Sequence, residues 1–395
     1  MQEQLKFRCT IMRGGTSKAV FFKRNELPQE PELRDRIILA VFGSPDLRQI
    51  DGLGGSDITT SKVAIIGPPT REDADVDYNF GQVHLTQAKV IWNSNCGNIS
   101  AAVGPYAIDE GMVIPQEPYT TVRVHNVNTQ KILIERVETK DGNAVVSGDY
   151  VLDGVPGTGS RIDLDYKMTY GSATGKLLPT GNPVDTLHVP GVGDVTVSIV
   201  DIANSVCFVK AADIGITGHE SRPEIAADQK LMDKLEAIRA AAALRCGFIQ
   251  EGECAADVSP LRPMLSFVAP AEDYADYASG KIIRKEDLDF LARIMYNQMP
   301  VETYTGTGTI CTTVAAMIDG TVVNQVCGPE PKKTGIVRFG HSRGINSVAV
   351  EVENLPEGPV VRKATIPRTA RRIMDGCVYV KRERLENDPN MYIKK

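Results

Sequence analysis

The chain has 395 residues, with 44 basic and 50 acidic side chains and a formal net charge of −6. At roughly 150 residues per domain, this length predicts two or three domains. The content of 42% hydrophobic and 24% charged residues is typical of a globular protein and excludes wholesale disorder. The acidic balance and the 6% aromatic residues argue against a nucleic-acid-binding surface.

Eight cysteines are scattered along the chain, and no C-x-x-C pair occurs among them. This spacing argues against a zinc ribbon, a thioredoxin-type redox site or a disulfide scaffold. The first residues lack the apolar core of a signal peptide, and no apolar run approaches the roughly 18 residues needed to cross a bilayer. We therefore expect a cytoplasmic protein with reduced thiols.

Alternating or β-branched runs predict many short strands separated by turns. In chain order, they cover residues 6–12, 18–22, 61–66, 76–83, 88–92, 121–126, 132–138, 144–147, 194–201, 207–210, 265–268, 336–339, 347–353 and 377–380. Helical spacing of apolar residues predicts fewer helices, at residues 32–42, 99–109, 223–246, 285–297 and 310–318, with another beginning after Pro367.

The strands outnumber the helices and are not separated by regular crossover helices, which favours an α+β fold of curved sheets over a doubly wound parallel sheet. One helix in each half follows a loop of small residues, at residues 95–98 and 306–309. This echo predicts two similar domains. A boundary near residues 179–183 divides the chain into an N-terminal domain, 1–182, and a C-terminal domain, 183–395.

Two Thr-Ser-Lys segments follow glycines in the first 62 residues. The first contains Thr16, Ser17 and Lys18, whose hydroxyls and cation suit a carboxylate or a phosphate, although a tight turn between strands is an equal alternative. The second runs from Gly55 to Ser61 and Lys62. Lys62 enters an apolar run, and an apolar environment favours the neutral amine that a general base requires.

The third candidate segment is Asn95-Cys96-Gly97-Asn98, at the start of a predicted helix. Reactive cysteines and bound anions are both common at helix N-termini. Of the eight cysteines, only Cys96 combines polar neighbours, a glycine and a predicted helix start, and Cys311 is the second choice. We therefore expect Cys96 to be the working thiol.

Three segments of the later half offer further ligand-binding groups. They are the loop with Thr180, Gly181 and Asn182, the segment with Thr307 and Gly308, and the turn with His341 and Arg343. Arg368, Arg371 and Arg372 form a basic cluster in which one arginine could bind a carboxylate while the others are solvated. The five isolated histidines predict no metal site, and no G-x-S-x-G elbow supports a serine hydrolase.

Five motifs in order, R-G-G-T-S-K, G-L-G-G-x-x-x-T-T-S-K, N-C-G-N, P-T-G-N and T-A-R-R-I-M-D-G, make the chain resemble the PrpF family from Arg13 to Val380. This family includes isomerases of 3-methylitaconate and aconitate and a tautomerase of 4-oxalomesaconate. Residues 42–46, 48–52 and 107–111 are most similar to the methylitaconate isomerase branch.

The resemblance implies a diaminopimelate-epimerase-like fold: two similar domains, each a curved β-structure around a central helix, with the active site in the cleft between them. It also implies proton chemistry without a cofactor on small unsaturated di- or tricarboxylates. Lys62 and Cys96 match the family residues that face the substrate, and Thr16 and Ser17 match a carboxylate-binding motif. The family often has Gly-His-Pro-Ser-Gly where this chain has Ser342 and Arg343, so we hypothesise that Arg343 favours an extra substrate carboxylate.

The expected reaction is a 1,3-allylic proton shift that moves a C=C bond. Lys62 is the expected base and Cys96 the expected acid, with the reverse assignment open. The N–H groups of Gly97 and Asn98 and the hydroxyls of Thr16 and Ser17 are the expected donors to the enolate. Two alternatives remain: a racemase or epimerase of the same fold, and a non-catalytic accessory protein of an iron–sulfur dehydratase. A homo-oligomer and association with an aconitase-type dehydratase also remain open.

Overall fold

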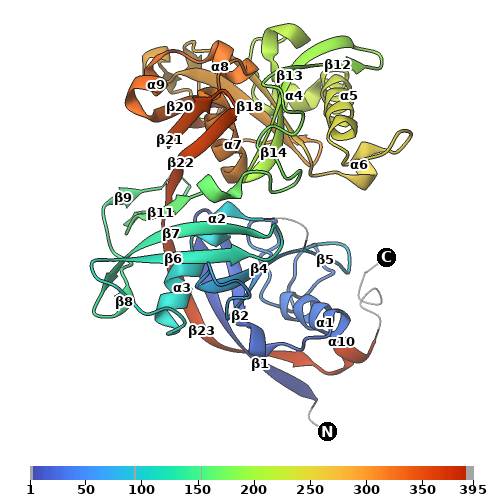
Figure 1. Cartoon of the computed structure of the whole chain (residues 1–395). Helices are drawn as coiled ribbons and strands as arrows, with labels where there is room; N and C mark the ends of the chain where they lie inside the picture. The colour runs from blue at the N-terminus through green and yellow to red at the C-terminus, as the bar shows by residue number, and fades with distance from the viewer. Residues whose placement is uncertain (1–2, 93–94, 153, 388–395) are drawn as a thin grey trace. The chain divides into compact units, whose positions relative to one another are not determined.

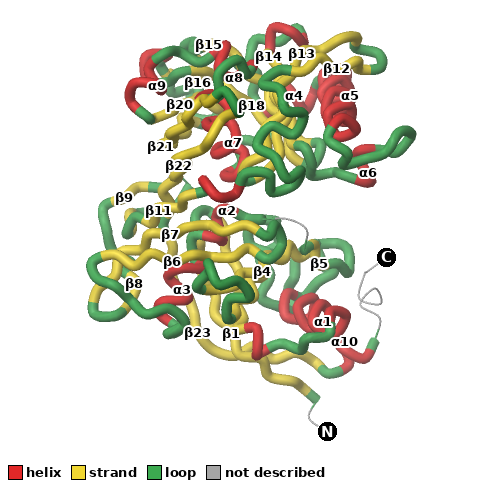
Figure 2. Tube along the Cα trace, in the orientation of Figure 1, coloured by secondary structure: helices red, strands yellow, loops and turns green. Residues whose placement is uncertain are grey.

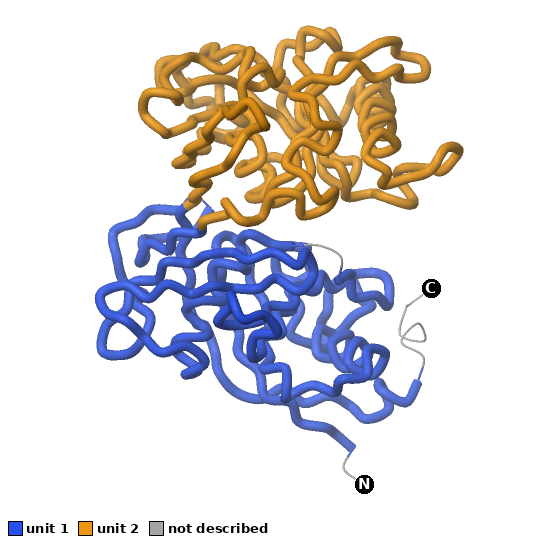
Figure 3. Tube along the Cα trace, in the orientation of Figure 1, with its two compact units in different colours: residues 1–164, 367–395 blue, residues 165–366 orange. Residues whose placement is uncertain are grey.

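The computed structural model describes residues 3–92, 95–152 and 154–387. The chain divides into two compact units, which Figure 3 colours separately. Unit 1 comprises residues 1–164 and 367–395, and unit 2 comprises residues 165–366. The boundary expected after Asn182 lies inside unit 2 in this division. We propose that the two domains are these units, the first of which is completed by the C-terminal residues.

Unit 1 is built mainly of strands (Figures 1 and 2). Its paired strands follow the order β23-β1-β2-β3-β4-β6-β7, in which β2/β3 and β4/β6 are parallel and the other neighbours antiparallel. The strands are β1 (Gln4–Gly14), β2 (Ser17–Lys23), β3 (Lys62–Gly67), β4 (Val76–Val83), β5 (Val90–Ile91), β6 (Tyr119–Asn126), β7 (Lys131–Lys140), β8 (Asn143–Ala144), β9 (Tyr150–Val151), β10 (Thr158–Gly159), β11 (Ile162–Asp165) and β23 (Ala370–Lys381).

Two short helices of unit 1, α2 (Gly97–Ser100) and α3 (Val103–Asp109), lie against the inner face of this sheet. Helix α2 contacts β1 and β2, while α3 contacts β6, β7 and β23. Because these strands come from both halves of the sheet, the sheet curves around the helix pair. The outer face packs against α1 (Pro31–Phe42), and the remaining helices are η1 (Arg24–Glu26) and α10 (Glu383–Glu386).

The local sequence explains the ends of α1. The Glu30 carboxylate accepts hydrogen bonds from the N–H groups of Glu32 and Leu33, which satisfies free donors of the first turn. Pro31 stands at the first helical position, where its missing N–H costs nothing. Gly43 ends the helix in the left-handed region, at φ 72°.

Unit 2 repeats this plan. Its paired strands follow the order β12-β13-β14-β15-β18-β20-β21-β22, with β14/β15 and β18/β20 parallel. The strands are β12 (Asp185–Val189), β13 (Gly193–Ile202), β14 (Asn204–Lys210), β15 (Met264–Pro270), β16 (Tyr274–Ala275), β17 (Ile282–Ile283), β18 (Phe290–Tyr296), β19 (Met299–Pro300), β20 (Ile336–His341), β21 (Gly344–Leu355) and β22 (Gly358–Arg368).

The central helix of unit 2 is α7 (Gly306–Met317), which contacts β13, β14, β20 and β21. Every residue of α7 from Thr307 to Met317 is buried, as expected of a helix enclosed by a sheet. The other helices are η2 (Lys167–Thr169), η3 (Ala211–Ile214), α4 (Arg222–Ala227), α5 (Gln229–Arg245), α6 (Ala255–Val258), η4 (Lys285–Asp287), α8 (Val322–Val326) and α9 (Glu330–Thr334).

The two units correspond strand by strand. In unit 1, α1 lies in the chain between the parallel strands β2 and β3, and in unit 2, α5 lies between the parallel strands β14 and β15. In the same way, α2 and α3 lie between the parallel strands β4 and β6, and α7 lies between the parallel strands β18 and β20. The prediction of two similar domains, each a curved sheet around a central helix, is therefore confirmed. Within the described ranges, no helix is both long and apolar enough to cross a membrane.

Some predicted elements are wrong. The helix expected at residues 285–297 is mostly strand β18, and the helix expected after Pro367 is strand β23. Only Asn143–Ala144 forms a strand near residues 144–147. The helix expected at 99–109 is split between α2 and α3, and that at 223–246 between α4 and α5. In β18, residues 290–295 are all buried, Arg293 included, so no two-residue alternation distinguishes this strand from a helix.

Candidate active site

The first Thr-Ser-Lys segment forms the tight hairpin between β1 and β2, where Gly14 pairs with Ser17. Two glycines let this hairpin lie directly against α2. A Cβ on Gly14 would stand 2.4 Å from the carbonyl oxygen of Asn98, and a Cβ on Gly15 would stand 2.3 Å from Asn98 Oδ1. Gly15 also has φ +51°, which side chains disfavour. The glycines therefore bring the hairpin's hydroxyls to Asn98.

Asn98 is the centre of a polar cluster. Its Nδ2 donates to Thr16 Oγ1 at 2.9 Å and to Ser17 Oγ at 3.5 Å, and its Oδ1 accepts from Arg368 Nε at 3.3 Å. Arg13 donates to the carbonyl oxygens of Gly15 and Thr369, both at 2.9 Å, and thereby ties the hairpin to the end of β22. Two hydroxyls, an amide and a guanidinium thus lie together, a set that suits a carboxylate.

Lys62 lies on the same face of the sheet as this cluster. Gly14 faces α2, and Ser17 pairs with Gly14 across the hairpin. Ala19, two residues beyond Ser17, pairs with Lys62 in the parallel strands β2 and β3. Side chains alternate along a strand and register partners share a face, so Ser17, Ala19 and Lys62 all point toward α2.

The ammonium of Lys62 is nearly buried, with the residue 8% exposed. Its Nζ donates to Gln82 Oε1 at 2.6 Å and lies 5.4 Å from the centre of the Phe80 ring. The preceding loop is shaped by Gly55, where a Cβ would stand 2.3 Å from Thr60 Oγ1, and by the buried Ser61, whose hydroxyl donates to Gln49. Lys18 is half-buried on β2.

Cys96 is half-buried and directly precedes α2. Its carbonyl oxygen accepts from the backbone N–H of Ser100 at 2.9 Å and from the Ser100 hydroxyl at 3.0 Å. Asn95 accepts from Asn126 Nδ2 at 2.8 Å, which attaches this segment to the end of β6. Because α2 has only one turn, its dipole at Cys96 is weaker than that of the longer helix expected from the sequence.

In unit 2, the loop of Thr180, Gly181 and Asn182 folds around Asp185 at the start of β12. Thr180 Oγ1 donates to one carboxylate oxygen at 2.6 Å and Asn182 Nδ2 to the other at 3.3 Å. Arg245 lies 3.5 Å from the same carboxylate. The polar groups of this loop are thus engaged with an anion of the chain itself.

Thr307 and Gly308 lie in the first turn of α7, and both are buried. The hydroxyl of Thr305 caps the helix by accepting from the Gly308 N–H at 3.0 Å. Cys311 is fully buried in the next turn, where its thiol donates to the carbonyl oxygen of Val200 at 3.2 Å. Burial raises the pKa of the Cys311 thiol, which argues against this residue as a second base.

His341 and Arg343 belong to the hairpin between β20 and β21. Burial, with a smaller effect from the Arg293 charge, lowers the pKa of His341 to about 3, so the imidazole stays neutral. Arg343 lies 3.1 Å from Asp276 Oδ1 and 2.8 Å from Glu302 Oε1. Two carboxylates of unit 2 therefore already balance the positive charge of Arg343, the residue that we expected to favour a substrate with an extra carboxylate.

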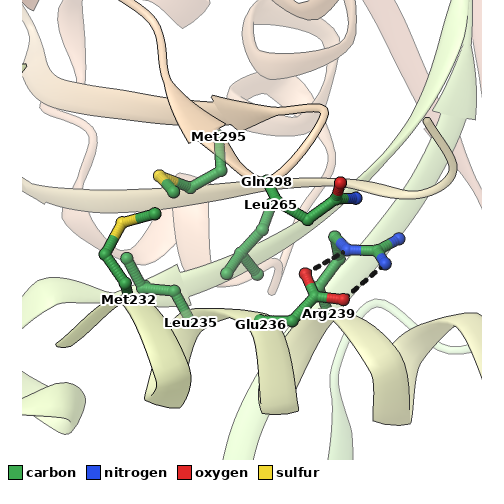
Figure 4. Close-up of a pocket in the computed structure, with 7 residues that line it drawn as sticks. All are labelled: Met232, Leu235, Glu236, Arg239, Leu265, Met295 and Gln298. Carbon is green, nitrogen blue, oxygen red and sulfur yellow. Dashed lines mark hydrogen bonds and ion pairs between the residues drawn. The ribbon is translucent and has the colours of Figure 1, made fainter. Parts of the chain in front are cut away.

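A small cavity of unit 2 lies between α5 and the sheet (Figure 4). Its apolar part is formed by Met232, Leu235, Leu265 and Met295. Arg239 pairs with Glu236 at 2.6 Å and donates to the carbonyl oxygens of Ser259 and Arg262. Because the polar groups of this cavity are engaged within the chain and none belongs to a predicted motif, we interpret it as a packing feature.

Comparison with known proteins assigns the chain to a family. Residues 4–381 match the family model described as PrpF protein. The chain belongs to the PrpF family. PrpF relatives include a 3-methylitaconate isomerase of Eubacterium barkeri, 50% identical over 388 residues, which are 98% of this chain and 100% of the relative. A 2-methyl-aconitate isomerase of Shewanella oneidensis is 38% identical over 95% of this chain and 97% of the relative. The prediction of an isomerase is confirmed by these relatives.

Solved structures agree with this assignment. The crystal structure of a methylitaconate-delta-isomerase matches with a TM-score of 0.87 and 49% identity, over 98% of each chain. A hydroxyproline epimerase from Agrobacterium vitis matches with a TM-score of 0.51 at 12% identity over 95% of this chain and 92% of that chain, a likeness of fold alone. The predicted epimerase-like fold of the PrpF chain is confirmed.

Two residues of this PrpF chain were missing from the predicted site set. Of the three clustered arginines, only Arg368 is shown contacting Asn98, whereas Arg372 pairs with Glu110 at 2.8 Å and Arg371 is exposed. The sequence motif indicated the arginine cluster but not which arginine contacts Asn98. Gln82 carried no signal in the sequence, because its contact with Lys62 depends on the register of β3 and β4. Within the described residues, no group of three or more His, Cys, Asp or Glu side chains could hold a metal ion.

Proposed function

We propose that this protein catalyses a 1,3-allylic proton shift in a small unsaturated di- or tricarboxylate, without a cofactor. The observation that carries the proposal is the convergence of Lys62 with Thr16, Ser17 and Asn98 on one face of the unit 1 sheet. A base beside a carboxylate-binding cluster is what removal of a proton near a carboxylate requires.

Substrate binding is proposed to use the Asn98 cluster. Thr16 and Ser17 supply hydroxyl donors, and Arg368 supplies the positive charge that suits a carboxylate. Asn98 contacts all three side chains, so it keeps their spacing constant. The N–H groups of Gly97 and Asn98 are proposed as further donors to the charge that develops in the reaction.

The reaction breaks a C–H bond at the allylic carbon, and the proton passes to Lys62 Nζ. The electron pair of that bond forms the new C=C bond, while the electrons of the old double bond move into the carboxylate to give a dienolate. The Cys96 thiol then donates its proton to the far carbon, which completes the shift. A proton returned from Lys62 to Cys96, directly or through solvent, restores the enzyme, and the roles of the two residues can be reversed.

Methylitaconate is the first substrate to test, because 50% identity extends over 98% of the chain to a relative named for that activity. Aconitate and oxalomesaconate complete the panel. Incubation of the protein with each acid in D₂O, followed by NMR, reports both double-bond migration and the carbon that exchanges its proton. Migration with deuterium at the far carbon supports the proposal, whereas exchange and inversion at one carbon indicates an epimerase.

Lys62→Ala tests the base directly. We expect it to abolish proton exchange, while Lys89→Ala, at an exposed position after β4, leaves exchange unchanged.

A protein inert toward the whole panel that nevertheless restores a damaged iron–sulfur dehydratase would establish the accessory role instead. The scattered spacing of the eight cysteines in the sequence is what favours a reducing, cytoplasmic location. That location, the oligomeric state and any dehydratase partner stay predictions.

A further inference from the structure

The side chain of Gln82 links Lys62 to the loop that precedes it. Gln82 Oε1 accepts a hydrogen bond from Lys62 Nζ at 2.6 Å. Gln82 Nε2 donates to the carbonyl oxygens of Ile58 at 3.1 Å and Ser61 at 2.9 Å. Both carbonyl oxygens can only accept, so a flipped amide would lose both of these bonds. The backbone therefore holds Oε1 toward the ammonium.

Strand register places this amide beside Lys62. Lys62 and Gln82 are directly paired residues of the antiparallel strands β3 and β4, so their side chains share a face of the sheet. Phe80, two residues before Gln82, lies on the same face, and its ring lies 5.4 Å from Nζ. A rigid sheet thus restricts the ammonium on one side with an aromatic ring and on another with a fixed hydrogen-bond acceptor.

The neutral charge of this acceptor matters for proton exchange. An ammonium and a neutral amine both have an N–H to donate, so an amide oxygen can orient Lys62 in either state. A carboxylate in the same place would favour the ammonium and retain its proton. The nearby carboxylate of Asp57 has a lowered pKa chiefly because the Thr59 hydroxyl and N–H donate to it, with a smaller effect from the Lys62 charge.

We propose that Gln82 is a positioning residue that aims the Lys62 amine while leaving both of its protonation states accessible. This inference rests on the proposed function, in which Lys62 exchanges the substrate proton. Gln82 acts through Lys62 and through the backbone of Ile58 and Ser61. It is not assigned any contact with the substrate.

Two substitutions separate orientation from charge. Gln82→Met keeps the length of the side chain but removes the acceptor, and we expect kcat to fall about 10- to 100-fold with KM within about threefold, since misplacement of a catalytic group by about 1 Å has effects of this size. Gln82→Glu keeps an acceptor for Lys62 and adds a negative charge, and, like Gln82→Met, it removes the N–H donors to Ile58 and Ser61. We expect the activity of this variant to begin at a higher pH than that of the wild type, because Lys62 stays protonated up to a higher pH.

Gln325→Met and Gln325→Glu are the matched controls. Gln325 Nε2 donates to the backbone carbonyl oxygen of Gly320 at 2.8 Å, as Gln82 does to Ile58 and Ser61, but Gln325 lies on α8 in unit 2. We expect both controls to retain the wild-type kcat and pH profile. Thermal unfolding of all four variants identifies any loss of folded protein.

A measurement independent of activity separates this inference from the proposed function. In protein labelled with [ε-¹³C]lysine, the Lys62 signal is identified by its absence in Lys62→Arg, and its titration is followed by NMR. We expect the midpoint of the Lys62 titration to move upward in Gln82→Glu and the signal to shift in Gln82→Met. An unchanged Lys62 titration in both variants would overturn the inference, even if the wild type isomerises none of the acids. So would a Gln82→Met enzyme with wild-type kcat.

Discussion

Gly15→Ala tests whether close packing between the β1–β2 hairpin and Asn98 creates the substrate-binding cluster. The added Cβ would stand 2.3 Å from Asn98 Oδ1 and 2.8 Å from Asn98 Cγ, so the Asn98 side chain must move. That movement breaks its hydrogen bonds to Thr16 and Arg368. The substitution therefore disturbs the cluster without removing any of its polar groups.

Gly15→Ala is expected to affect both the free energy of folding and the binding of substrate, and the two contributions are separate. An alanine at φ +51° costs about 1–2 kcal/mol of folding free energy. Loss of the Asn98 contacts removes preorganised hydrogen bonds that contribute about 0.5–1.5 kcal/mol each. If about 1.4 kcal/mol of this is lost from substrate binding, KM rises about tenfold.

Gly111→Ala provides the matched control. Gly111 has φ +67°, and a Cβ there would meet nothing within 4 Å, so the variant carries the backbone strain alone. We expect both variants to lose similar free energy of unfolding in urea, whereas only Gly15→Ala raises KM in the isomerisation assay. If Gly15→Ala keeps the wild-type KM, or if Gly111→Ala raises it equally, the role assigned to the hairpin contact is wrong.

Three further predictions concern a buried acid, the cysteines and Arg343. Glu135 is fully buried, and its carboxyl group accepts a hydrogen bond from the Gly104 N–H at 2.9 Å. Burial raises the pKa of Glu135 in the folded protein. The neutral acid therefore contributes stability that is fully present below the ordinary glutamate pKa near 4.3 and is lost as the pH rises toward the pKa of Glu135 in the folded state. Urea unfolding should therefore show Glu135→Gln gaining stability relative to the wild type between pH 4 and pH 8, and a difference independent of pH would contradict this. Cys96→Ser should lower deuterium exchange at least about 100-fold while the buried Cys311→Ser stays within about threefold, since only Cys96 is assigned to the reaction; equal losses would favour a two-thiol epimerase. Arg343→Ala should change the ratio of rates on di- and tricarboxylates by less than about twofold, because Asp276 and Glu302 already balance the guanidinium, and a change above about tenfold would restore the specificity hypothesis.

Much of the fold could be predicted because local patterns agreed with the final sheet. In β2, the outer-face residues Val20 and Phe22 alternate with Phe21, which contacts Tyr106 of α3 on the inner face. The helix expected at residues 310–318 is α7, but the loop expected at 306–309 forms its first turn, and its N-cap is Thr305. Strand β18 was mistaken for a helix because its residues are buried on both faces, so no alternation reveals the strand.

In the candidate site, too, some residues could be predicted from local motifs and others depend on contacts between distant parts of the chain. Motifs predicted Lys62, Cys96 and the hairpin hydroxyls as site residues, because glycine-rich turns and polar residue types are local signals of ligand binding. The role of Gln82 depends on the register of β3 and β4, and the role of Arg368 depends on a contact between residues 270 positions apart. Likewise, the ion pairs that engage Arg343 join three separate segments of unit 2.

The sequence alone therefore predicted an isomerase through its resemblance to the PrpF family, and it predicted the hairpin and most of the strands through residue type and short-range periodicity. Only the tertiary structure decided which arginine joins Asn98, which amide orients Lys62 and that the last strand completes unit 1. The reason is physical: hydrogen bonds between distant strands form when the whole sheet closes, and local spacing does not encode which distant partners then meet.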